Sequence, residues 1–368
     1  MRALLLFLVV LVACEPSRAA RRYTREEVRQ KLSRLETVGL EVGEFAIEGS
    51  SAVVDGDTIK VKGLDASLRL LAIDTEETFK HDEERRAYSA GWEEYKKKMR
   101  GNSPRPAKFA TPLGEEAKKF AQQFFDGVDK VKLERDHPGE IRDFFGRYLS
   151  YVFVFKDGQW LNYNLEAVKA GMTPYFVKYG RSRRFHQSFV EAEKKAREAG
   201  LGIWAPGKQH YDDYDERLKW WHEREQAITR FEKEMADHPD SYIALTRFDA
   251  LFRLEQKLGE TVTLLGSVGE VRWGERGPTV VKLSRKKGQD FDVVFFDKDV
   301  AVASGLQFKQ GEYVQVRGVV AKYSDKQGNK RLQLQVTLPG QVLAPSAPLE
   351  QMLKERPEED AQQERDGD

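Results

Sequence analysis

Two segments decide the fold of this chain, and they read VDGDTIK (residues 54–60) and LRLLAIDTEE (residues 68–77). The apolar–polar alternation that begins in the first segment and the β-rich composition of the second predict two strands, with Gly63 in the turn between them. Such a hairpin brings Asp57, at the start of one strand, close to Asp74, at the end of the next. Two carboxylates that converge in this way predict a site for one hard cation.

Taken alone, the Asp-Gly pair at 55–56 is a common turn signal, and a purely structural interpretation of it is the favoured one. Arg69 shifts that balance because it stands among apolar residues, five positions before Asp74. A guanidinium held there offers a planar fork to phosphate oxygens. The segment DFFGRYLSYV (residues 143–152) supplies a second arginine, Arg147, just ahead of an apolar strand. Two arginines beside a carboxylate-bound cation predict a cage for a phosphodiester.

With these residues the chain resembles the thermonuclease (staphylococcal-nuclease-like) family. The resemblance covers about 160 residues in family order, which makes it far more specific than any single motif. It implies an OB-type five-stranded barrel that carries three helices, and helical periodicity places these helices at 114–125, 161–171 and 183–200. The matching segments are VVDGDTIKV (53–61), LRLLAIDTEE (68–77), GEEAKKFA (114–121), DFFGRYLSYVFV (143–154), LNYNLEAVKAG (161–171) and AEKKAREAGLGIW (192–204).

The resemblance implies a calcium site in the first two segments. Asp57 and Asp74 would bind Ca²⁺ through their carboxylates and Thr75 through its backbone carbonyl, while Asp55 would belong to the surrounding acidic shell. The chemistry agrees with this implication, because Ca²⁺ accepts six to eight oxygen ligands in loose geometry and needs no softer donor. The six histidines show no metal-ligand spacing with cysteine, so surface or capping roles are expected for them.

The resemblance also implies the residues of a hydrolytic reaction. Glu77 would orient or deprotonate the attacking water, and Arg69 and Arg147 would clamp the scissile phosphate. The family attacks the 5′ P–O bond with water and leaves 3′-phosphate ends. A carboxylate a few residues beyond a metal ligand can reach such a water, which suits general-base catalysis. The alternative for Glu77 is that it belongs to a solvated acidic loop, and the combined constellation favours the catalytic role.

Three departures from the family pattern qualify this expectation. Glu76 stands where relatives usually have proline, and the Phe-Phe pair at 144–145 replaces the lysine and tyrosine that contact a terminal phosphate. Tyr175 is the residue nearest to the other family tyrosines. The third departure is a longer segment at 78–112, with a charged helical run and a turn-rich end. A solvated surface excursion is the favoured interpretation of it, and a clamp that supplies lysines and arginines to the substrate is the alternative.

The N-terminus predicts where the protein works. An apolar run of eleven residues (3–13) is too short to span a bilayer but suits a signal peptide. The sequence LVAC (11–14) resembles a bacterial lipobox, which implies removal of residues 1–13 and lipidation of Cys14. Cys14 is the only cysteine, so it cannot form an internal disulfide. Glu15 after it implies sorting to the outer membrane, and we therefore expect an exported, lipid-anchored protein of the bacterial cell envelope.

Composition divides the rest of the chain. Hydrophobic residues make up 40% and charged residues 33%, with a net charge of +1, so two domains with their own cores are expected. The acidic tail carries eight acidic residues against three basic ones from position 350 onward and is predicted to be disordered. The predicted organisation is a tether with a short helix (14–43), a nuclease-like domain (44–205), a helical connector (206–258), an OB-like domain (259–342) and the tail (343–368).

The segment 259–342 predicts a second barrel. Five strands, with a helical break between the third and fourth, match an OB fold. From 260 to 331 the chain has thirteen lysines and arginines and nine acidic residues, so the barrel is basic. Exposed aromatic side chains on such a surface stack on single-stranded bases, and Trp273, Phe291 and Tyr323 are the candidates. The favoured alternative for each ring individually is a place in the barrel core.

The expected protein is thus α+β and mostly β, with two OB-like barrels joined by helices. The expected function is a Ca²⁺-dependent phosphodiesterase that cuts DNA, with single strands favoured and RNA allowed, and with no obligate protein partner. A different class of protein is the alternative: a catalytically inactive nucleic-acid-binding or adhesion lipoprotein that uses the barrel as a scaffold. The joint presence of the carboxylates and arginines argues against it, since a scaffold has no need of Asp57, Arg69, Asp74, Glu77 and Arg147 together.

Overall fold

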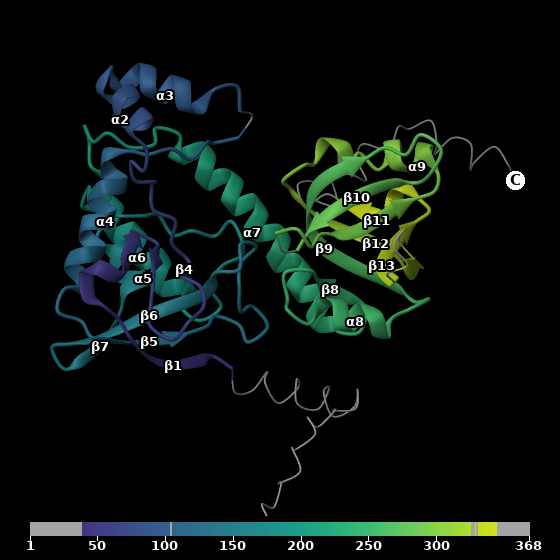
Figure 1. Ribbon diagram of the computed structural model, residues 1–368, viewed down its shortest axis with the longest axis horizontal. Helices are drawn as coiled ribbons and strands as arrows, with labels where there is room; N and C mark the ends of the chain where they lie inside the picture. Colours follow the sequence, from purple (N-terminus) through teal and green to yellow (C-terminus); the bar gives the residue numbers. More distant parts are fainter. Residues whose placement is uncertain (1–38, 104, 286, 325–327, 329, 344–368) are drawn as a thin grey trace, which may run out of the picture. The chain divides into compact units, whose positions relative to one another are not determined.

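A computed structural model describes residues 39–343, apart from 104, 286, 325–327 and 329 (Figure 1). Three predictions lie outside the described residues: the signal peptide with Cys14, the short helix ahead of the barrel, and the acidic tail beyond 343. Within the described part of the chain, no helix has the length and apolar character that crossing a membrane requires.

The first sheet forms an OB-type barrel, as predicted. Its strands follow the order β1-β5-β6-β4-β3-β2, and β7 pairs with the C-terminal part of β6. The row begins with β1 and ends with β2. These two strands follow each other along the chain, with only the short helix η1 between them, so the row closes on itself. A backbone hydrogen bond from Lys62 N to Ala46 O (2.9 Å) supports the closure. The elements are β1 (Glu41–Ala46), η1 (Gly49–Ala52), β2 (Val53–Asp55), β3 (Thr58–Ile59), β4 (Leu68–Leu70), β5 (Lys130–Glu134), β6 (Tyr148–Lys156) and β7 (Gln159–Asn162).

Three helices accompany this barrel, and the prediction of all three is confirmed: α4 (Pro112–Phe125), α5 (Tyr163–Lys169) and α6 (His186–Glu198). Thr111 caps α4 by accepting a hydrogen bond from Gly114 N, and a proline occupies the first helical position, where it fits without loss. The apolar stripes of the helices join the interior of the barrel in one core. Fully buried members of that core include Ile59, Leu68, Val152, Tyr163 and Phe189.

The segment 78–112 has a small core of its own. It folds into α2 (Asp82–Ser89) and α3 (Trp92–Arg100), which confirms the predicted helical run. Tyr95 is 1% exposed and packs against Phe109, whose ring contacts Tyr211 from the chain beyond the barrel (4.8 Å between centroids). The small core of this segment therefore also includes Leu113 of α4 and, from the chain beyond the barrel, Ile203, Tyr211 and Tyr214.

Glu76, in the loop that follows β4, connects this loop to the segment 78–112 and to the chain at 211–214. The side chain is 1% exposed, and its Oε2 accepts a hydrogen bond from Thr111 Oγ1. Its Oε1 accepts hydrogen bonds from Tyr211 N and from Tyr214 Oη, each at 2.8 Å. Burial is the main cause that raises the pKa of Glu76. The residue that replaces the family proline is thus a buried anchor for the loop 74–77, which the sequence did not reveal.

Beyond η2 (Gly202–Trp204), the predicted helical connector is only partly helical. It contains α7 (Tyr214–Asp237) and α8 (Ala250–Gln256), but the strand β8 (Tyr242–Ala244) lies between them. β8 pairs in parallel with the first strand of the second sheet. Ile228 and Phe231 of α7 pack in one apolar cluster with Ala244 and Leu265. The predicted helical connector thus contains a short strand as well, because the apolar residues after Pro239 complete the second sheet.

The second sheet repeats the strand order of the first. The pairings β9–β10, β10–β11, β11–β13, β13–β12 and β12–β9 form a closed ring of five strands, with β11 parallel to β13. This is the ring that an OB fold requires, so the prediction of a second barrel is confirmed. The elements are β9 (Thr261–Arg272), β10 (Thr279–Ser284), β11 (Phe291–Phe295), α9 (Lys298–Ala303), η3 (Leu306–Phe308), β12 (Tyr313–Ser324), β13 (Lys330–Val336), η4 (Pro339–Gln341) and β14 (Val342–Leu343).

We predict that Glu76→Ala destabilises the protein by about 3 kcal/mol, because Thr111, Tyr211 and Tyr214 would each keep a buried donor without an acceptor. Glu76→Gln keeps an acceptor oxygen and removes the buried charge. The pKa of Glu76 is higher in the folded protein than in the unfolded chain, so folding favours the protonated acid. The free energy of unfolding of the wild type therefore falls as the pH rises from the unfolded-state pKa through the folded-state pKa. Chemical denaturation at acidic and neutral pH should therefore show that the difference in free energy of unfolding between the two proteins shifts in favour of the Gln variant as pH rises. An alanine variant as stable as the wild type would contradict this account.

Candidate active site

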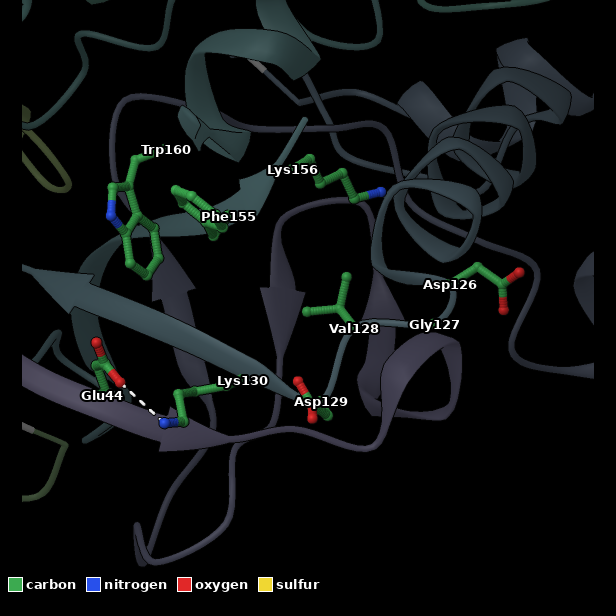
Figure 2. A pocket seen from close by; sticks show the side chains of 9 residues that line it. All are labelled: Glu44, Asp126, Gly127, Val128, Asp129, Lys130, Phe155, Lys156 and Trp160. Carbon is green, nitrogen blue, oxygen red and sulfur yellow. Dashed lines mark ion pairs between the residues drawn. The ribbon is translucent and has the colours of Figure 1, made fainter. Parts of the chain in front are cut away.

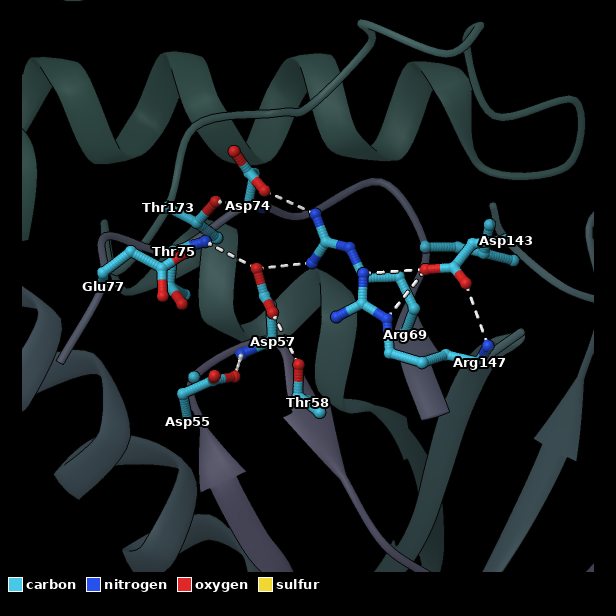
Figure 3. A network of polar contacts seen from close by, with 12 residues as sticks. Asp55, Asp57, Thr58, Arg69, Asp74, Thr75, Glu77, Asp143, Arg147 and Thr173 are labelled. Atoms are coloured by element: carbon cyan, nitrogen blue, oxygen red, sulfur yellow. Dashed lines mark hydrogen bonds and ion pairs between the residues drawn. The ribbon is translucent and has the colours of Figure 1, made fainter. Parts of the chain in front are cut away.

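Arg69 lies at the centre of the polar network in Figure 3. β4 carries it into the interior, where the residue is 9% exposed. Its Nη2 donates to Asp74 Oδ1 (2.5 Å), and its Nη1 forms an ion pair with Asp57 Oδ2. Burial acts to lower the pKa of Arg69, but Asp57 and Asp74 outweigh burial and raise it, so the guanidinium remains charged. The structure thus brings together the three residues that the sequence predicted for the site.

The two aspartates are held by further hydrogen bonds. Asp57 Oδ1 accepts from Thr58 Oγ1 (3.0 Å), and Asp57 Oδ2 accepts from Thr75 N (3.2 Å). The backbone N of Asp74 donates to Thr173 Oγ1 (2.9 Å), a contact that no sequence signal indicated. Burial acts to raise the pKa of Asp74, yet nearby cations, Lys108 and Arg69 among them, lower it below its usual value. Both carboxylates are therefore fixed in position, and Asp74 is held ionised.

The donor set fits a hard cation. Asp57 and Asp74 contact the same guanidinium, and the contacts of Asp74 with Arg69 and Lys108 both use Oδ1. Among the described residues, no cluster of three or more His, Cys, Asp or Glu side chains is placed to hold a metal. The predicted set does not need one, because its third ligand is a backbone carbonyl, that of Thr75. Oxygen donors of this kind suit Ca²⁺.

Asp55 and Glu77 flank this pair. Asp55 accepts a hydrogen bond from Asp57 N (3.3 Å), and burial, followed by the charge of Asp57, raises the pKa of Asp55 to about 6. Glu77 is accessible, with 34% of its side chain exposed, and Glu77 Oε2 accepts from Lys80 Nζ (2.9 Å). A partly exposed carboxylate three residues after Asp74 is placed to contact a water molecule at the site.

Close packing against two glycines fixes the loop that carries Thr75 and Glu77. A Cβ on Gly114 would lie 2.0 Å from the Glu77 carbonyl oxygen, and a Cβ on Gly56 would lie 2.6 Å from Thr75 Cγ2. Only glycine fits at these two positions. Ala72, just ahead of the loop, has a left-handed backbone (φ 62°), which costs a non-glycine residue of the order of 1 kcal/mol. The chain accepts this strain where it turns Asp74 toward Arg69.

Arg147 is held by a partner that the sequence analysis missed. Arg147 Nε and Nη2 each lie 2.7 Å from Asp143 Oδ2, and the backbone N of Arg147 donates to Asp143 Oδ1 (2.9 Å). The spacing of four residues around Gly146 (φ 87°) makes this tight turn. Beside it, Phe145 is 65% exposed, and the Arg147 guanidinium lies 5.7 Å from its ring centre. Asp143 thereby positions Arg147 (Figure 3). Phe145 places an accessible ring next to it.

Two of the four aromatic candidates for nucleic-acid contact are buried: Tyr175, the residue nearest to the family tyrosines, and Phe291, for which a place in the core was the favoured alternative. Tyr175 is 5% exposed, stacks on Phe189, and accepts a hydrogen bond from Ser182 N. Phe291 is 4% exposed in the core of the second barrel. Neither ring can face a base, because each fills the apolar interior of its domain. Tyr179, four residues after Tyr175, is the accessible tyrosine of this region, with 61% of its surface exposed.

The other two candidates of the second barrel remain accessible. Trp273 is 48% exposed at the end of β9. Tyr323 is partly exposed, and its hydroxyl donates to Asp292 Oδ2 (2.8 Å). The stacking role of both rings stays a prediction.

The segment 78–112 contributes directly to the site. Its first lysine, Lys80, contacts Glu77, and Lys108 near its end donates to Asp74 Oδ1 (2.6 Å). These contacts support the alternative interpretation of the segment, in which it supplies cations to the site.

A cavity of about 410 Å³ lies elsewhere on the first barrel, between the turn at 126–130 and the β6–β7 hairpin (Figure 2). Phe155 and Trp160 line it, but its lysines already have partners. Lys130 pairs with Glu44 (3.1 Å), and Lys156 donates to the Phe124 carbonyl (2.5 Å). None of the residues that surround Arg69 reaches this cavity, so it is separate from the candidate active site.

Comparison with known proteins identifies the family. Residues 67–206 match the family described as Staphylococcal nuclease homologue. "Thermonuclease" of Staphylococcus hyicus is 30% identical over 156 residues, 42% of this chain and 72% of that protein. "SPbeta prophage-derived endonuclease YokF" of Bacillus subtilis is 31% identical over 154 residues, 41% of this chain and 42% of that protein. "Uncharacterized protein MJ1439" of Methanocaldococcus jannaschii is 28% identical over 154 residues, 41% of this chain and 68% of that protein.

The chain thus spans between two fifths and three quarters of the length of these relatives. The family match at 67–206 includes the strand with Arg69, the loop through Glu77 and the turn with Arg147, and it begins after Asp57. The chain belongs to the staphylococcal nuclease family and carries a nuclease domain.

Proposed function

We propose that this protein is a Ca²⁺-dependent nuclease that hydrolyses phosphodiester bonds of DNA, with single strands favoured and RNA allowed, to 3′-phosphate ends. One observation carries the proposal: a buried, charged Arg69 lies between two fixed carboxylates, with an accessible Glu77 beside them. Structural needs alone do not explain this cluster, because burying three charges costs more than burying apolar residues of similar size.

The cluster suits phosphodiester hydrolysis residue by residue. Arg69 stays charged between the two aspartates, and its guanidinium is the group that we propose for an oxygen of the scissile phosphate. Arg147 adds a second guanidinium for the charge that develops in the transition state. Glu77 can accept the proton of the attacking water. Ca²⁺ held by Asp57, Asp74 and the Thr75 carbonyl would supply charge neutralisation at the phosphate.

The second barrel supports a role in holding the strand. OB barrels bind oligonucleotides on the face of strands 2 and 3 and through the loop between strands 1 and 2. Trp273 stands at the start of that loop, directly after β9, and is half-exposed. A ring in that position can stack on a base without sequence preference.

The location of the protein follows from its N-terminus, and we propose that lipidated Cys14 anchors it in the bacterial cell envelope, with the outer membrane favoured. The support is the LVAC sequence after an apolar run of eleven residues.

We predict that chelation of Ca²⁺ abolishes cleavage of single-stranded DNA and that Asp57→Ala has the same effect. Glu77→Gln should slow cleavage by about 10² to 10⁴ and leave binding of the strand intact, because it removes only the proton acceptor. Glu198→Gln, an exposed change on α6, is the matched control and should cut at the wild-type rate. Cleavage that persists in chelator would overturn the mechanism. Absence of cleavage by the wild type under all metal conditions would favour the inactive scaffold.

For the second barrel, Trp273→Ala should weaken binding of single-stranded DNA by about 1 to 3 kcal/mol, the usual value of one stacked base. Phe308→Ala removes another exposed ring, 83% accessible, from η3 and serves as the control. Fluorescence anisotropy with the full-length chain measures both. Equal affinities of the two variants and the wild type would show that Trp273 does not contact the strand.

For the location, Cys14→Ser should move the protein from the membrane fraction to the soluble fraction of cells, since a lipid is the proposed anchor. Immunoblots of washed membranes from cells that express each form decide the question. A Ser variant that resists a salt wash in the membrane fraction would mean that another anchor exists.

A further inference from the structure

Both ends of the segment 78–112 deliver a lysine to the candidate active site. The first is Lys80, whose Nζ contacts Glu77 Oε2 (2.9 Å) and lies 3.8 Å from Asp55 Oδ2. The backbone of Lys80 is held by α2, because its N donates to Glu84 Oε2 (3.1 Å). This half-exposed ammonium group therefore occupies one oxygen of the carboxylate that is proposed to accept the proton of the attacking water.

The second is Lys108, whose Nζ contacts Asp74 Oδ1 (2.6 Å). The chain is fixed on both sides of this lysine. The carbonyl of the residue before it accepts from Arg217 Nη2 (2.8 Å), and the backbone N of the residue after it donates to Tyr211 Oη (3.0 Å). The side chain itself is 42% exposed, so the ammonium group can leave Asp74 for solvent while the backbone stays in place.

The two lysines compensate charge that Arg69 leaves uncompensated. Among the described residues, the ion pairs of the carboxylates at positions 55, 57, 74 and 77 are formed with Arg69, Lys80 and Lys108. Arg69 alone would leave three of these four negative charges uncompensated, and the two lysines reduce the excess to one. Two ammonium groups together carry the same charge as one Ca²⁺. In electrostatic terms the segment 78–112 thus supplies the charge of a metal ion to the site.

Lysine and Ca²⁺ oppose each other at these carboxylates. A cation that binds the Asp74 carboxylate meets the ammonium group already in contact with it, and like charges so close together repel. Asp74 is 5% exposed, so water screens this repulsion only weakly. Arg69 is buried and cannot withdraw, whereas Lys108 can. Binding of Ca²⁺ therefore favours release of the lysine, and by thermodynamic reciprocity the engaged lysine weakens the binding of Ca²⁺.

We propose that Lys80 and Lys108 are built-in counter-cations of the metal-free site, which compete with Ca²⁺ and set the concentration at which it binds. This proposal rests on the proposed Ca²⁺ dependence and adds a regulation of the same site to it. At low Ca²⁺ concentration, Lys108 stays on Asp74 and Lys80 stays on Glu77, so a metal ligand and the proton acceptor are both engaged. The segment 78–112, a departure from the family pattern, thereby determines when the nuclease is active.

The test is isothermal titration calorimetry of Ca²⁺ with the full-length chain in the absence of nucleic acid. Lys108→Met keeps a long side chain without its charge and should lower the Kd for Ca²⁺ about tenfold. Lys80→Met should lower it about threefold, because Lys80 contacts neighbours of the proposed ligands and not a ligand itself. Lys108→Arg keeps the charge and should bind Ca²⁺ like the wild type. Lys96→Met, the matched control, removes a lysine of the same segment that pairs with Glu93 and Asp212, and should leave the Kd unchanged.

Chemical labelling of the wild type measures the release of the lysines without any substitution. An ammonium group that contacts a carboxylate is shielded from acetic anhydride, and its release exposes it. Mass spectrometry after brief acetylation should show that Lys80 and Lys108 react faster as Ca²⁺ saturates the site, in the concentration range of the calorimetric Kd. The rate at Lys96 should stay constant. A rate at Lys108 that does not change with Ca²⁺ would overturn the proposal.

The titrations also separate this proposal from the proposed function. Equal Kd values for the wild type and Lys108→Met would overturn the competition and leave the Ca²⁺ site intact. A higher Kd for Lys108→Met would overturn it as well, because the lysine would then position Asp74 for the metal. Absence of Ca²⁺ binding to both proteins would refute the proposed Ca²⁺ site, and the competition with it.

Discussion

The contact of one buried guanidinium with two carboxylates is the interaction on which the site depends. Arg69 is placed by β4, Asp57 by the turn into β3, and Asp74 by the loop after β4. A buried ion triad of this kind contributes little to stability, but removal of one partner leaves a charge uncompensated and is strongly destabilising. The barrel therefore keeps all three or loses the site, and the rest of the loop is built to hold them in position.

The two barrels show how the same fold serves different chemistry. Both have five strands in one order, with the third and fifth strands parallel. In the second barrel the third strand, β11, carries Asp292, which pairs with Lys282 and accepts from Tyr323. No arginine stands on β11, so the cage around Arg69 has no counterpart there. The fold supplies a platform, and function depends on the side chains that it carries.

Sequence reasoning reached the fold and the centre of the site because both depend on local patterns. The strand-rich sequence after position 259 predicted the second barrel, and the spacing of Asp57, Arg69 and Asp74 predicted a cluster that the structure brings together. What it missed depends on contacts between distant segments. Glu76 finds its donors at 211 and 214, Asp74 meets Thr173 and Lys108, and no local pattern reveals such partners. Tertiary packing also decides burial, which places Phe291 in the barrel core, the favoured alternative for that ring, and removes Tyr175 from contact with the strand.

The most direct test of the central claim is the single-turnover cleavage rate of Arg69→Lys at saturating Ca²⁺ and saturating single-stranded DNA. Lysine keeps the charge between Asp57 and Asp74 but loses the planar fork that takes the phosphate oxygen. The account predicts a rate that falls by about 10² or more, with the circular dichroism spectrum and the affinity for Ca²⁺ preserved. A rate equal to that of the wild type would show that Arg69 only balances the charge of the two aspartates and takes no part in the reaction.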